Sequence, residues 1–565
     1  MQRCDRSRAK SIGVTASNDY DILVIGGGIF GACTLWEATL RGYNAALLES
    51  FDFCSGSSAN SYKIVHGGTR YLQHMDLIRL RASSRERRAM LNIAPHLVEP
   101  LPIMVPTYGM GKLSKPFLGV GLSLYDLLTL DRNRGISVPE RCLKRTRFLS
   151  RQEVLNEFPS LNSAGLTGAC VFEDGRFYNP TRLVYTFIKS AVLRGAAAVN
   201  YCPVTDFIIN DKRVIGVRAK DKQTGQSIAV KAKVVVNAAG PWAERLLHQS
   251  LPNQYRPGGT YSRDACFVIN RRFPGKYTLA VQGQTKDPDA VLSRPARHLF
   301  LSPWRNYTLV GVWHKVTDLH PESVNLSSEE LQVFIDEINA SYPSLQLKLE
   351  DVKFCNYGLV PFGENEEGSQ DLSYGKRSLL MDHKALNGVD GLVSIIGVRY
   401  TMARGEAEKT LNVVEKKLGR EPQASLSDKV KLWGGEFDSF TQLKAAVASE
   451  WPFEIKESTL DSIAHNFGSG YRELLPLVGK NSKLAEPIDG ADITGAEVVY
   501  SCRSEMVCSL NDIVFRRTDL GTGGNPGDSA LHAVGKIVQS ELGWSNERLS
   551  SEISAVKEKF QTFGR

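Results

Sequence analysis

The 565-residue sequence has no segment that marks it as membrane-spanning, disulfide-stapled or nucleic-acid-binding. It lacks any run of about eighteen apolar residues, which a spanning helix requires. Its ten cysteines include no CxxC pair and no tight cluster with histidine, so we expect reduced thiols in a cytoplasmic compartment and no metal site. No stretch of Lys or Arg is long enough for a nucleic-acid-binding arm, so no nucleic-acid partner is expected. Residues 1–18 are basic but lack an apolar core, which predicts a disordered tail and not a secretory signal.

What the sequence does contain is an ordinary globular composition with a mild excess of positive charge. Hydrophobic residues make up 42% and charged residues 23% of the chain, and 69 Lys and Arg stand against 61 Asp and Glu. The length allows large buried cores and roughly two to four structural units. The net charge of +8 is compatible with an anionic substrate, an anionic membrane surface, or no specific partner.

The strongest pattern lies near the amino terminus. Residues 21–25 are a branched apolar run, typical of a buried parallel strand, and GGGIFG follows directly at 26–31. Apolar residues at helical spacing then continue to Leu40. A second strand is predicted at 45–48, and it ends at Glu49. This order of strand, glycine turn, helix, strand and acid predicts a dinucleotide-binding unit.

Each residue of this unit has a physical reason. Gly26 permits the tight turn, Gly28 lets the backbone approach a diphosphate, and Gly31 lets the helix pack closely on the strand. The helix N-terminus presents free N–H groups and a partial positive charge to the phosphates. Glu49 can accept hydrogen bonds from ribose hydroxyls.

Segments further along the chain favour FAD over NAD as the cofactor. Residues 55–61 are small and polar, which suits them to wrap a second phosphate, and HGG at 66–68 would let the chain pass close to a flat ring. Two more apolar segments, 234–242 and 391–397, would return to the sheet beside the cofactor. The predicted cofactor-binding residues are Gly26, Gly28, Gly31, Glu49, Ser57, Ser61, His66, Gly67, Gly68, Val204, Ala239, Gly240, Gly397 and Thr401.

The chain resembles a known family in several motifs. They are DILVIGGGIFGA, SSANSYKIVHGGTRYL, VVNAAGPW, IIGVRYTMARGEAE, HNFGSG and VFRRTDLG. Together they are similar to the flavin-dependent glycerol-3-phosphate dehydrogenases of the D-amino-acid-oxidase-like fold, over nearly the whole chain after residue 18.

We therefore expect an α/β fold with a Rossmann-like FAD-binding domain, an inserted antiparallel-sheet substrate domain and a helical C-terminal domain. The predicted FAD-binding domain is discontinuous and comprises 19–100, 168–245 and 375–425. The predicted substrate domain comprises 101–167 and 246–374, and the C-terminal domain 426–565. Within the last, helical spacing is found at 443–451, 458–467, 496–514 and 529–542.

The resemblance also implies a reaction. In that family FAD accepts a hydride at N5 from C2 of sn-glycerol 3-phosphate, giving dihydroxyacetone phosphate, and the electrons pass to quinone. Arg70 and Tyr71 stand where the family has its Arg-Tyr next to substrate, and Arg399 stands where the family usually has a lysine. His314 replaces a polar family position, and it is either a general base or a structural residue. His66 is either a support for its loop or the base.

Other positions depart from the family pattern. Val360 stands where the family has a phosphate-binding arginine, and Ala265 stands where it has a pocket histidine. A further arginine of the family falls near the position of Met381. Each lost charge-assisted hydrogen bond would cost about 1.5–3 kcal/mol of phosphate binding. Candidates to restore the charge are Arg263, Arg297 and Lys315. The alternatives are an FAD-dependent dehydrogenase or oxidase of another substrate (a sugar, polyol or amine derivative) and a non-catalytic flavoprotein.

Residues 112–128 are apolar with basic residues at their front. They are either an ordinary packed helix or an amphipathic helix that dips into a bilayer, as quinone-reducing members of the family are thought to do. The expected location is therefore the cytoplasm. The alternative is peripheral binding to the inner face of the cytoplasmic membrane. A homodimer is left open.

Overall fold

The structure is a computed structural model that describes residues 18–72, 76–109, 114–251, 260–283, 298–317, 321–362 and 378–561, together with residues 8, 13 and 15. Of the predicted tail at 1–18, therefore, little is described. Arg8 within it is buried, and its guanidinium donates to Asp221 Oδ1 at 2.6 Å and to the Asn200 carbonyl at 2.6 Å.

The amino-terminal pattern forms the centre of the first sheet. Its strand order is β16-β17-β10-β1-β2-β7, with β9 paired to β10 and β8 to β9. The strands from β17 to β7 run parallel, as expected for a Rossmann-like unit. The strand bounds are β1 (Asp19–Ile25), β2 (Ala45–Leu48), β7 (Ala197–Val199), β8 (Val204–Asn210), β9 (Arg213–Lys220), β10 (Ser227–Asn237), β16 (Leu379–Asp382) and β17 (Leu392–Ile396).

The apolar run of β1 is continuous because both faces of this sheet are covered. Ile22 and Val24 belong to the core beneath helices α2, α7 and α11, whereas Leu23 and Ile25 belong to the core on the other face. These helices and the two short ones beside the sheet are α2 (Ile29–Leu40), α7 (Pro180–Leu193), α8 (Ala243–Ser250), α10 (His383–Asn387) and α11 (Ala403–Lys417).

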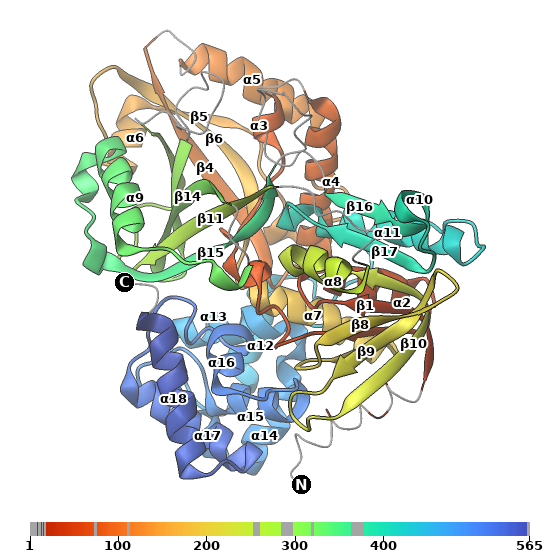
Figure 1. The fold of residues 1–565 in the computed structure, drawn as a ribbon. Coiled ribbons are helices and arrows are strands. Elements are labelled where there is room, and N and C mark those ends of the chain that lie inside the picture. Colours follow the sequence, from red (N-terminus) through yellow and green to blue (C-terminus); the bar gives the residue numbers. More distant parts are fainter. Residues whose placement is uncertain are drawn as a thin grey trace.

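The second sheet is mostly antiparallel, with the order β15-β11-β14-β13-β12-β4-β6-β3 and β5 paired to β6. Helices α6 and α9 contribute to the core on one of its faces, and α5 lies at the top of the molecule (Figure 1). Its strands are β3 (Ile64–Val65), β4 (Val98–Tyr108), β5 (Arg147–Ser150), β6 (Leu166–Phe177), β11 (Thr260–Ile269), β12 (Thr278–Gln282), β13 (His298–Trp304), β14 (Tyr307–Thr317) and β15 (Val352–Phe362). Its helices are α3 (Thr69–Leu72), α4 (Leu77–Ile93), α5 (Lys115–Leu128), α6 (Arg151–Glu157) and α9 (Ser328–Ser341). Strands β3 and β6 lie in this sheet, although their residues fall within the segments predicted for the FAD-binding domain.

The carboxyl-terminal part is helical and lies below the second sheet and beside the first (Figure 1). Its helices are α12 (Phe440–Glu450), α13 (Glu457–Phe467), α14 (Leu475–Lys480), α15 (Gly495–Ser504), α16 (Leu510–Asp512), α17 (Asp528–Leu542) and α18 (Asn546–Gln561). Short 3-10 and π turns connect the elements at η1 (Ser57–Asn60), η2 (Pro139–Arg141), η3 (Gly240–Trp242), η4 (Pro321–Ser323), η5 (Pro343–Leu345), η6 (Leu349–Asp351), η7 (Tyr400–Met402), η8 (Gly468–Glu473), η9 (Ser482–Ala485) and η10 (Ile513–Arg517).

The single helix predicted at 496–514 is wrong, because the chain breaks after Ser504. Met506 adopts a left-handed φ of 53°, and helical structure restarts at Leu510, where Ser509 and Asp512 form a capping box. Within the described ranges, no helix is both long and apolar enough to cross a bilayer.

Candidate functional site

The glycine turn between β1 and α2 leaves no room for side chains. Gly26 has φ of 101°, and a Cβ there would lie 2.7 Å from the Ala238 carbonyl oxygen, at the end of β10. A Cβ on Gly31 would lie 1.8 Å from the Gly26 carbonyl oxygen. Real Cβ atoms do not approach so closely, so this turn requires glycine at both positions. The turn also touches the Ala239-Gly240 segment, which the sequence placed beside the same cofactor.

The N-terminus of α2 is capped by a side chain that sequence reasoning did not select. Gly28 is its N-cap and has no side chain to offer, and the Ile29 N–H donates instead to Ser58 Oγ at 3.0 Å. The predicted Ser57 donates to the Leu359 carbonyl at 3.1 Å, while Ser61 Oγ is buried and has no hydrogen-bond partner among the described residues. The polar composition of this stretch indicated a role, but only the fold decides which hydroxyl faces the helix.

Glu49 closes the turn from the end of β2. Its Oε2 accepts a hydrogen bond from the Gly27 N–H at 2.6 Å, and its Oε1 accepts one from the Phe51 N–H at 2.9 Å. Burial raises the pKa of this carboxyl, and the backbone N–H groups act in the opposite direction. Oε1 also accepts a hydrogen bond from Ser50 Oγ at 3.1 Å, so Oε2, with a single donor, is the oxygen that can still accept from a ribose hydroxyl.

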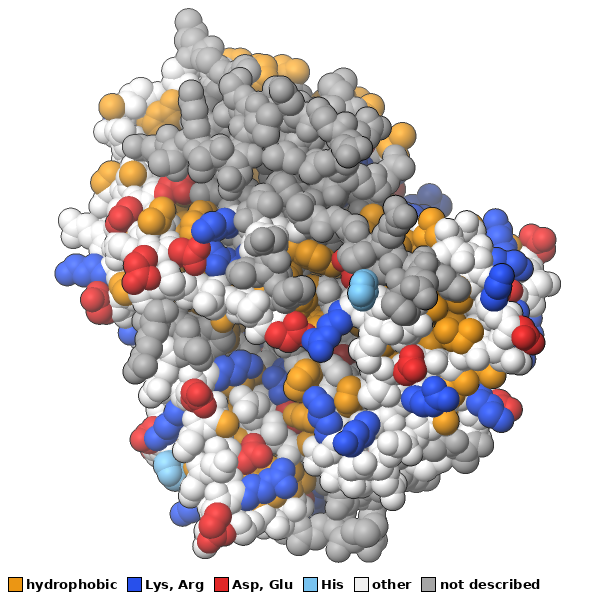
Figure 2. Space-filling view, in the orientation of Figure 1, with side chains coloured by type: hydrophobic (Ala, Val, Ile, Leu, Met, Phe, Trp, Pro, Cys, Tyr) orange, Lys and Arg blue, Asp and Glu red, His pale blue; other side chains and the backbone are white. Residues whose placement is uncertain are grey.

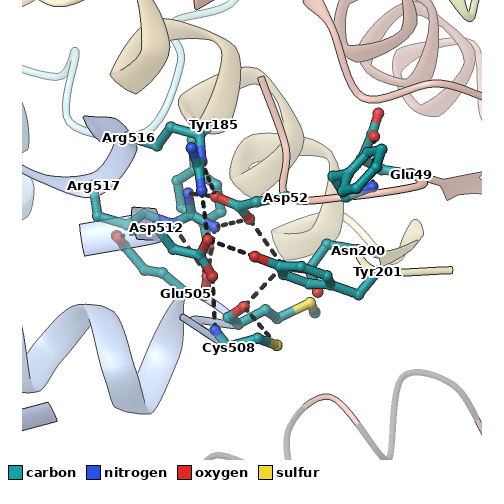
Figure 3. Close-up of polar contacts among 12 residues, drawn as sticks. Glu49, Asp52, Tyr185, Asn200, Tyr201, Glu505, Cys508, Asp512, Arg516 and Arg517 are labelled. Carbon is teal, nitrogen blue, oxygen red and sulfur yellow. Dashed lines mark hydrogen bonds and ion pairs between the residues drawn. The ribbon is translucent and has the colours of Figure 1, made fainter. Parts of the chain in front are cut away.

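Behind Glu49, a buried ionic network ties this end of the first sheet to the helical domain (Figure 3). Asp52 is fully buried and accepts hydrogen bonds from Arg516 Nε at 2.6 Å and from Arg517 Nη2 at 2.7 Å. Asn200 Nδ2 donates to the same carboxylate at 2.9 Å. Burial alone would raise the pKa of Asp52, but Arg517 and Arg516 outweigh it and hold the pKa below its ordinary value.

The HGG turn rests on a buried ion pair. The Gly67 N–H donates to Asp174 Oδ1 at 2.7 Å, and the same oxygen accepts from Arg87 Nη1 at 2.5 Å. A Cβ on Gly67 would lie 2.0 Å from that Nη1, and Gly68 has φ of 87°, so both glycines are required. The His66 side chain is mostly exposed, with Nδ1 3.6 Å from Asp174 Oδ2. Asp174 and Arg87, which hold this loop, carried no local signal in the sequence.

Two residues predicted to act on substrate lie together in the structure. The Arg399 guanidinium carbon lies 4.8 Å from the centre of the Tyr71 ring, a cation–π contact between the segment after β17 and helix α3. Thr401 follows in η7 and is buried. For Arg70 and His314 only the backbone is described, so their predicted side-chain roles lie outside the described structure. Along the backbone, Arg70 precedes Tyr71 in α3, and His314 pairs in register with Asp264.

Gly397 is covered by an aromatic ring that the sequence analysis did not single out. A Cβ there would lie 1.7 Å from Phe30 Cζ, so the half-buried ring of Phe30 rests directly on the glycine. Phe30 belongs to the first turn of α2. The glycine turn and the segment after β17 are therefore joined by this contact. Val204, another predicted cofactor residue, begins β8 and packs with Ala239 against the core on the far face of the first sheet.

The prediction that Ala265 occupies the pocket-histidine position is wrong. Ala265 is buried in the core beneath α9, with Phe267, so its side chain lies on the opposite face of β11 from segment 55–61. The adjacent Cys266 points to that segment, with Sγ 4.0 Å from the Ser61 carbonyl oxygen. Successive side chains of a strand alternate between faces, so a shift of one residue exchanges a core position for a site position.

The cations expected to replace the lost arginines point away from the site. Arg263 binds Glu330 of α9 through both terminal nitrogens at 2.9 Å, and Lys315 Nζ lies 3.1 Å from the same carboxylate. On the other face of β11, Ser262 Oγ donates to Asp264 Oδ1 at 2.9 Å. Val360 pairs with Ser262 in register. Arg297 lies outside the described residues, and Met381 is half-buried in β16.

These observations define the class of ligand that the site fits. The side-chain-free glycine turn, the N-terminus of α2, the buried Ser61 hydroxyl and the Glu49 carboxylate suit a dinucleotide with a diphosphate and a ribose. In the part of the chain that the structure describes, no group of three or more His, Cys, Asp and Glu side chains could hold a metal ion.

Comparison with known proteins gives the class. Residues 21–388 match the family model described as FAD dependent oxidoreductase, so the chain belongs to this family and the predicted FAD dependence is confirmed. Residues 425–549 match the C-terminal domain of alpha-glycerophosphate oxidase. The protein is thus an FAD-dependent oxidoreductase with the predicted α/β fold and helical C-terminal region.

Its relatives include proteins from distant organisms. The chain is 29% identical to a glycerol-3-phosphate dehydrogenase of Synechocystis, over 95% of this chain and 96% of that protein. It is 30% identical to the mitochondrial glycerol-3-phosphate dehydrogenase of Mus musculus, over 95% of this chain and 72% of that protein. The solved structure of the glycerol-3-phosphate dehydrogenase from Bacillus halodurans, complexed with FAD, shares the fold with a TM-score of 0.76 at 24% identity, covering 100% of this chain and 98% of that chain.

Proposed function

We propose that this enzyme oxidises the secondary alcohol of sn-glycerol 3-phosphate to the ketone of dihydroxyacetone phosphate and passes the electrons to a quinone. The observation that carries the proposal is that relatives bearing this activity in their names match 95% or more of the chain, including its helical domain. The contact of Arg399 with Tyr71, beside the cofactor segments, supplies a cation where an anionic substrate would bind.

Bound FAD would supply the two-electron acceptor, and the chain must hold the cofactor. We assign the diphosphate to the glycine turn and the N-terminus of α2, and the adenosine ribose to Glu49. The flat ring would lie between the HGG turn and the Gly397 segment. Asp174 and Arg87 then act as positioning residues, because they fix the backbone of the HGG turn.

The chain must also bind the substrate and remove the proton of its hydroxyl. Arg399 is proposed to bind the phosphate, held in orientation by the Tyr71 ring, since a guanidinium fork suits phosphate oxygens. Arg70, next to Tyr71, is proposed to add a second cation. His314 is proposed as the general base, because a neutral imidazole can accept a proton near neutral pH.

A second candidate function follows from the face of the second sheet near the site. That face carries Val360 and the acid Asp264, while Arg263 and Lys315 are bound to Glu330. A dianionic phosphate has fewer cations available here than the family pattern provides, which favours a neutral polyol, a sugar or an amine. The acid Asp264 would suit an amine best.

A substrate panel separates the two candidates. The FAD-bound protein is mixed without oxygen with sn-glycerol 3-phosphate, glycerol, sugars and amines, and loss of flavin absorbance is followed. Bleaching by glycerol 3-phosphate at millimolar concentration supports the first proposal; bleaching only by an unphosphorylated compound replaces it with the second. If dithionite alone bleaches the flavin, both proposals fail.

The role of Arg399 has its own test. We expect Arg399→Ala to retain FAD but to slow flavin reduction by glycerol 3-phosphate at least about tenfold, because a charge-assisted hydrogen bond to phosphate is lost. Arg218→Ala, at an exposed arginine of β9, is the matched control and should leave the rate unchanged. An unchanged rate in Arg399→Ala contradicts the assignment.

We further propose that α5 binds the surface of a membrane, which would give access to quinone. Phe117, Val120 and Leu127 are 59%, 74% and 62% exposed, whereas Gly119, Leu122 and Tyr125 of the same helix are buried. Figure 2 shows hydrophobic side chains along the top edge, where α5 lies in Figure 1. The helix begins at Lys115, and an exposed apolar helix face with a basic residue at its start suits interfacial binding.

Liposome flotation tests this surface. The purified protein should float with anionic vesicles, and replacing Phe117, Val120 and Leu127 by Ser should return it to the soluble fraction. Val333→Ser is the control, because Val333 is 60% exposed on α9. A wild-type protein that stays soluble, or a triple variant that still floats, excludes α5 as the membrane contact.

A further inference from the structure

A cavity of about 160 Å³ lies where the two sheets and the helical domain meet. Its walls include Lys63, between η1 and β3, Asn356 of β15, and Lys559 of α18. Strand β15 and the carboxyl-terminal helices face each other at this junction (Figure 1). Ser55, Ala59 and Asn60 also line the cavity, and they belong to the segment predicted to wrap a cofactor phosphate. The individual residues predicted to bind FAD, Ser57 and Ser61 of that segment included, do not line it, so the cavity adjoins the cofactor segment without containing those residues.

Lys63 is buried without a counter-charge. Its side chain is 3% exposed, and its Nζ lies 3.4 Å from the Ser61 carbonyl oxygen and 4.8 Å from the centre of the Trp304 ring. Across the described ranges, no carboxylate lies within ion-pair distance of this Nζ. An isolated buried ammonium is unfavourable, and burial lowers the pKa of Lys63 to about 8.

The opposite walls also present donors. Asn356 is 3% exposed, and its Nδ2 has no hydrogen-bond acceptor among the described residues. Lys559 lies across the cavity with Nζ 4.3 Å from the Phe515 ring centre, and burial lowers its pKa to about 7. The other nearby cation, Arg516, is already paired with Asp52 and Asp512.

We propose that this cavity binds a small tetrahedral oxyanion of the phosphate class between Lys63, Asn356 and Lys559. The charge of the anion would compensate the buried ammonium, and its oxygens would accept from the unpartnered amide. The donors come from three separate elements and line the same cavity. A tetrahedral oxyanion presents oxygens in four directions, whereas a carboxylate presents two oxygens in one plane.

The site would act as a bridge between domains. Lys63 belongs to the segment that follows η1, Asn356 to the second sheet and Lys559 to the last helix. An anion that binds only while these three elements are packed together would stabilise that packing by RT ln(1 + [anion]/Kd).

Crystals grown with sodium selenate test the site directly, since selenium scatters anomalously and selenate has the geometry of phosphate. The expected result is an anomalous peak in the cavity, within hydrogen-bond distance of Lys63 Nζ and Asn356 Nδ2. A map with no peak there, at selenate concentrations that saturate binding in solution, overturns the proposal.

Titration of the FAD-bound protein with inorganic phosphate tests it in solution. The Arg399→Ala background is used, because it removes one of the two cations proposed for the substrate site and so weakens phosphate binding there. Lys559→Met and Asn356→Leu should each raise the phosphate dissociation constant about tenfold or more. Lys557→Met, two residues away on α18 and paired with Asp528, is the control and should leave it unchanged.

The outcomes are decisive in either direction. Phosphate binding that survives in Arg399→Ala and weakens in Lys559→Met or Asn356→Leu supports the cavity, whatever the substrate panel finds. The proposal is overturned if both cavity variants bind phosphate as tightly as the Arg399→Ala background, or if Arg399→Ala alone abolishes phosphate binding. Retained flavin absorbance and circular dichroism in each variant establish that the loss is local.

Discussion

The ionic network behind Glu49 predicts a large effect for Asp52→Asn. The change keeps the size of the side chain but removes the charge that neutralises two buried guanidiniums. Arg516 retains its second partner, Asp512. Arg517 retains the Glu505 carbonyl as an acceptor, but its distance to the Glu505 carboxylate is 3.9 Å.

Breaking a buried ion pair by removing one partner costs about 3–5 kcal/mol. Since each 1.4 kcal/mol is about a factor of ten, separation of the helical domain should become about a hundredfold to a few thousandfold more frequent. The control is Asp206→Asn, at an exposed pair whose atoms are 3.8 Å apart. Loss of such a surface pair should cost at most about 1 kcal/mol.

Limited proteolysis is the appropriate assay, because cleavage tracks the population of the open form when closing is fast. Asp52→Asn should release the carboxyl-terminal fragment far faster than wild type at neutral pH. If Asp52→Asn and Asp206→Asn are cleaved at equal rates, the network does not hold the domains together.

The pH dependence of this effect has a defined sign. The folded pKa of Asp52 is lowered from the usual 3.8. Its contribution to stability is therefore complete above the unfolded pKa and is lost as the pH falls through the folded value. The difference between wild type and Asp52→Asn should be constant near neutrality and shrink only in strong acid. A difference that shrinks between pH 8 and 6 would assign the effect to another group.

Two further predictions concern the cofactor. Gly31→Ala should abolish FAD binding, because its Cβ would lie 1.8 Å from a backbone oxygen of the glycine turn. The control is Gly479→Ala, whose Cβ would meet nothing within 4 Å and which should therefore still bind FAD. The flavin absorbance of the purified proteins distinguishes the two variants. Glu49→Gln should raise the FAD dissociation constant about tenfold or more through weaker hydrogen bonds to ribose, and fluorescence titration of the apoprotein with FAD measures it. An affinity equal to wild type would remove Glu49 from the ribose site.

The cofactor end of the site could be predicted because its signals are local. Gly31 is constrained by the Gly26 carbonyl of the same strand–turn–helix, Gly26 has a positive φ that its own turn imposes, and Glu49 lies one strand later. The boundaries of helix 458–467 were likewise predicted to within a residue, since helical spacing is read from neighbouring positions.

The substrate end could not be predicted in the same way. Choosing Ala265 over Cys266 required the strand register to be correct to one residue, because an error of one exchanges the two faces of the sheet. Nothing in the local sequence of Arg263 or Lys315 shows that Glu330, on a helix further along the chain, binds both.

The sequence by itself determined the cofactor class, the order of elements and the places where only glycine fits, because backbone sterics and periodicity act over a few residues. Tertiary structure alone decided that Ser58 caps α2, that Asp174 and Arg87 hold the HGG turn, and that Phe30 covers Gly397. It also decided that donors from three elements surround one cavity. Such contacts join residues far apart in the chain, and their geometry exists only after the sheets and helices have packed.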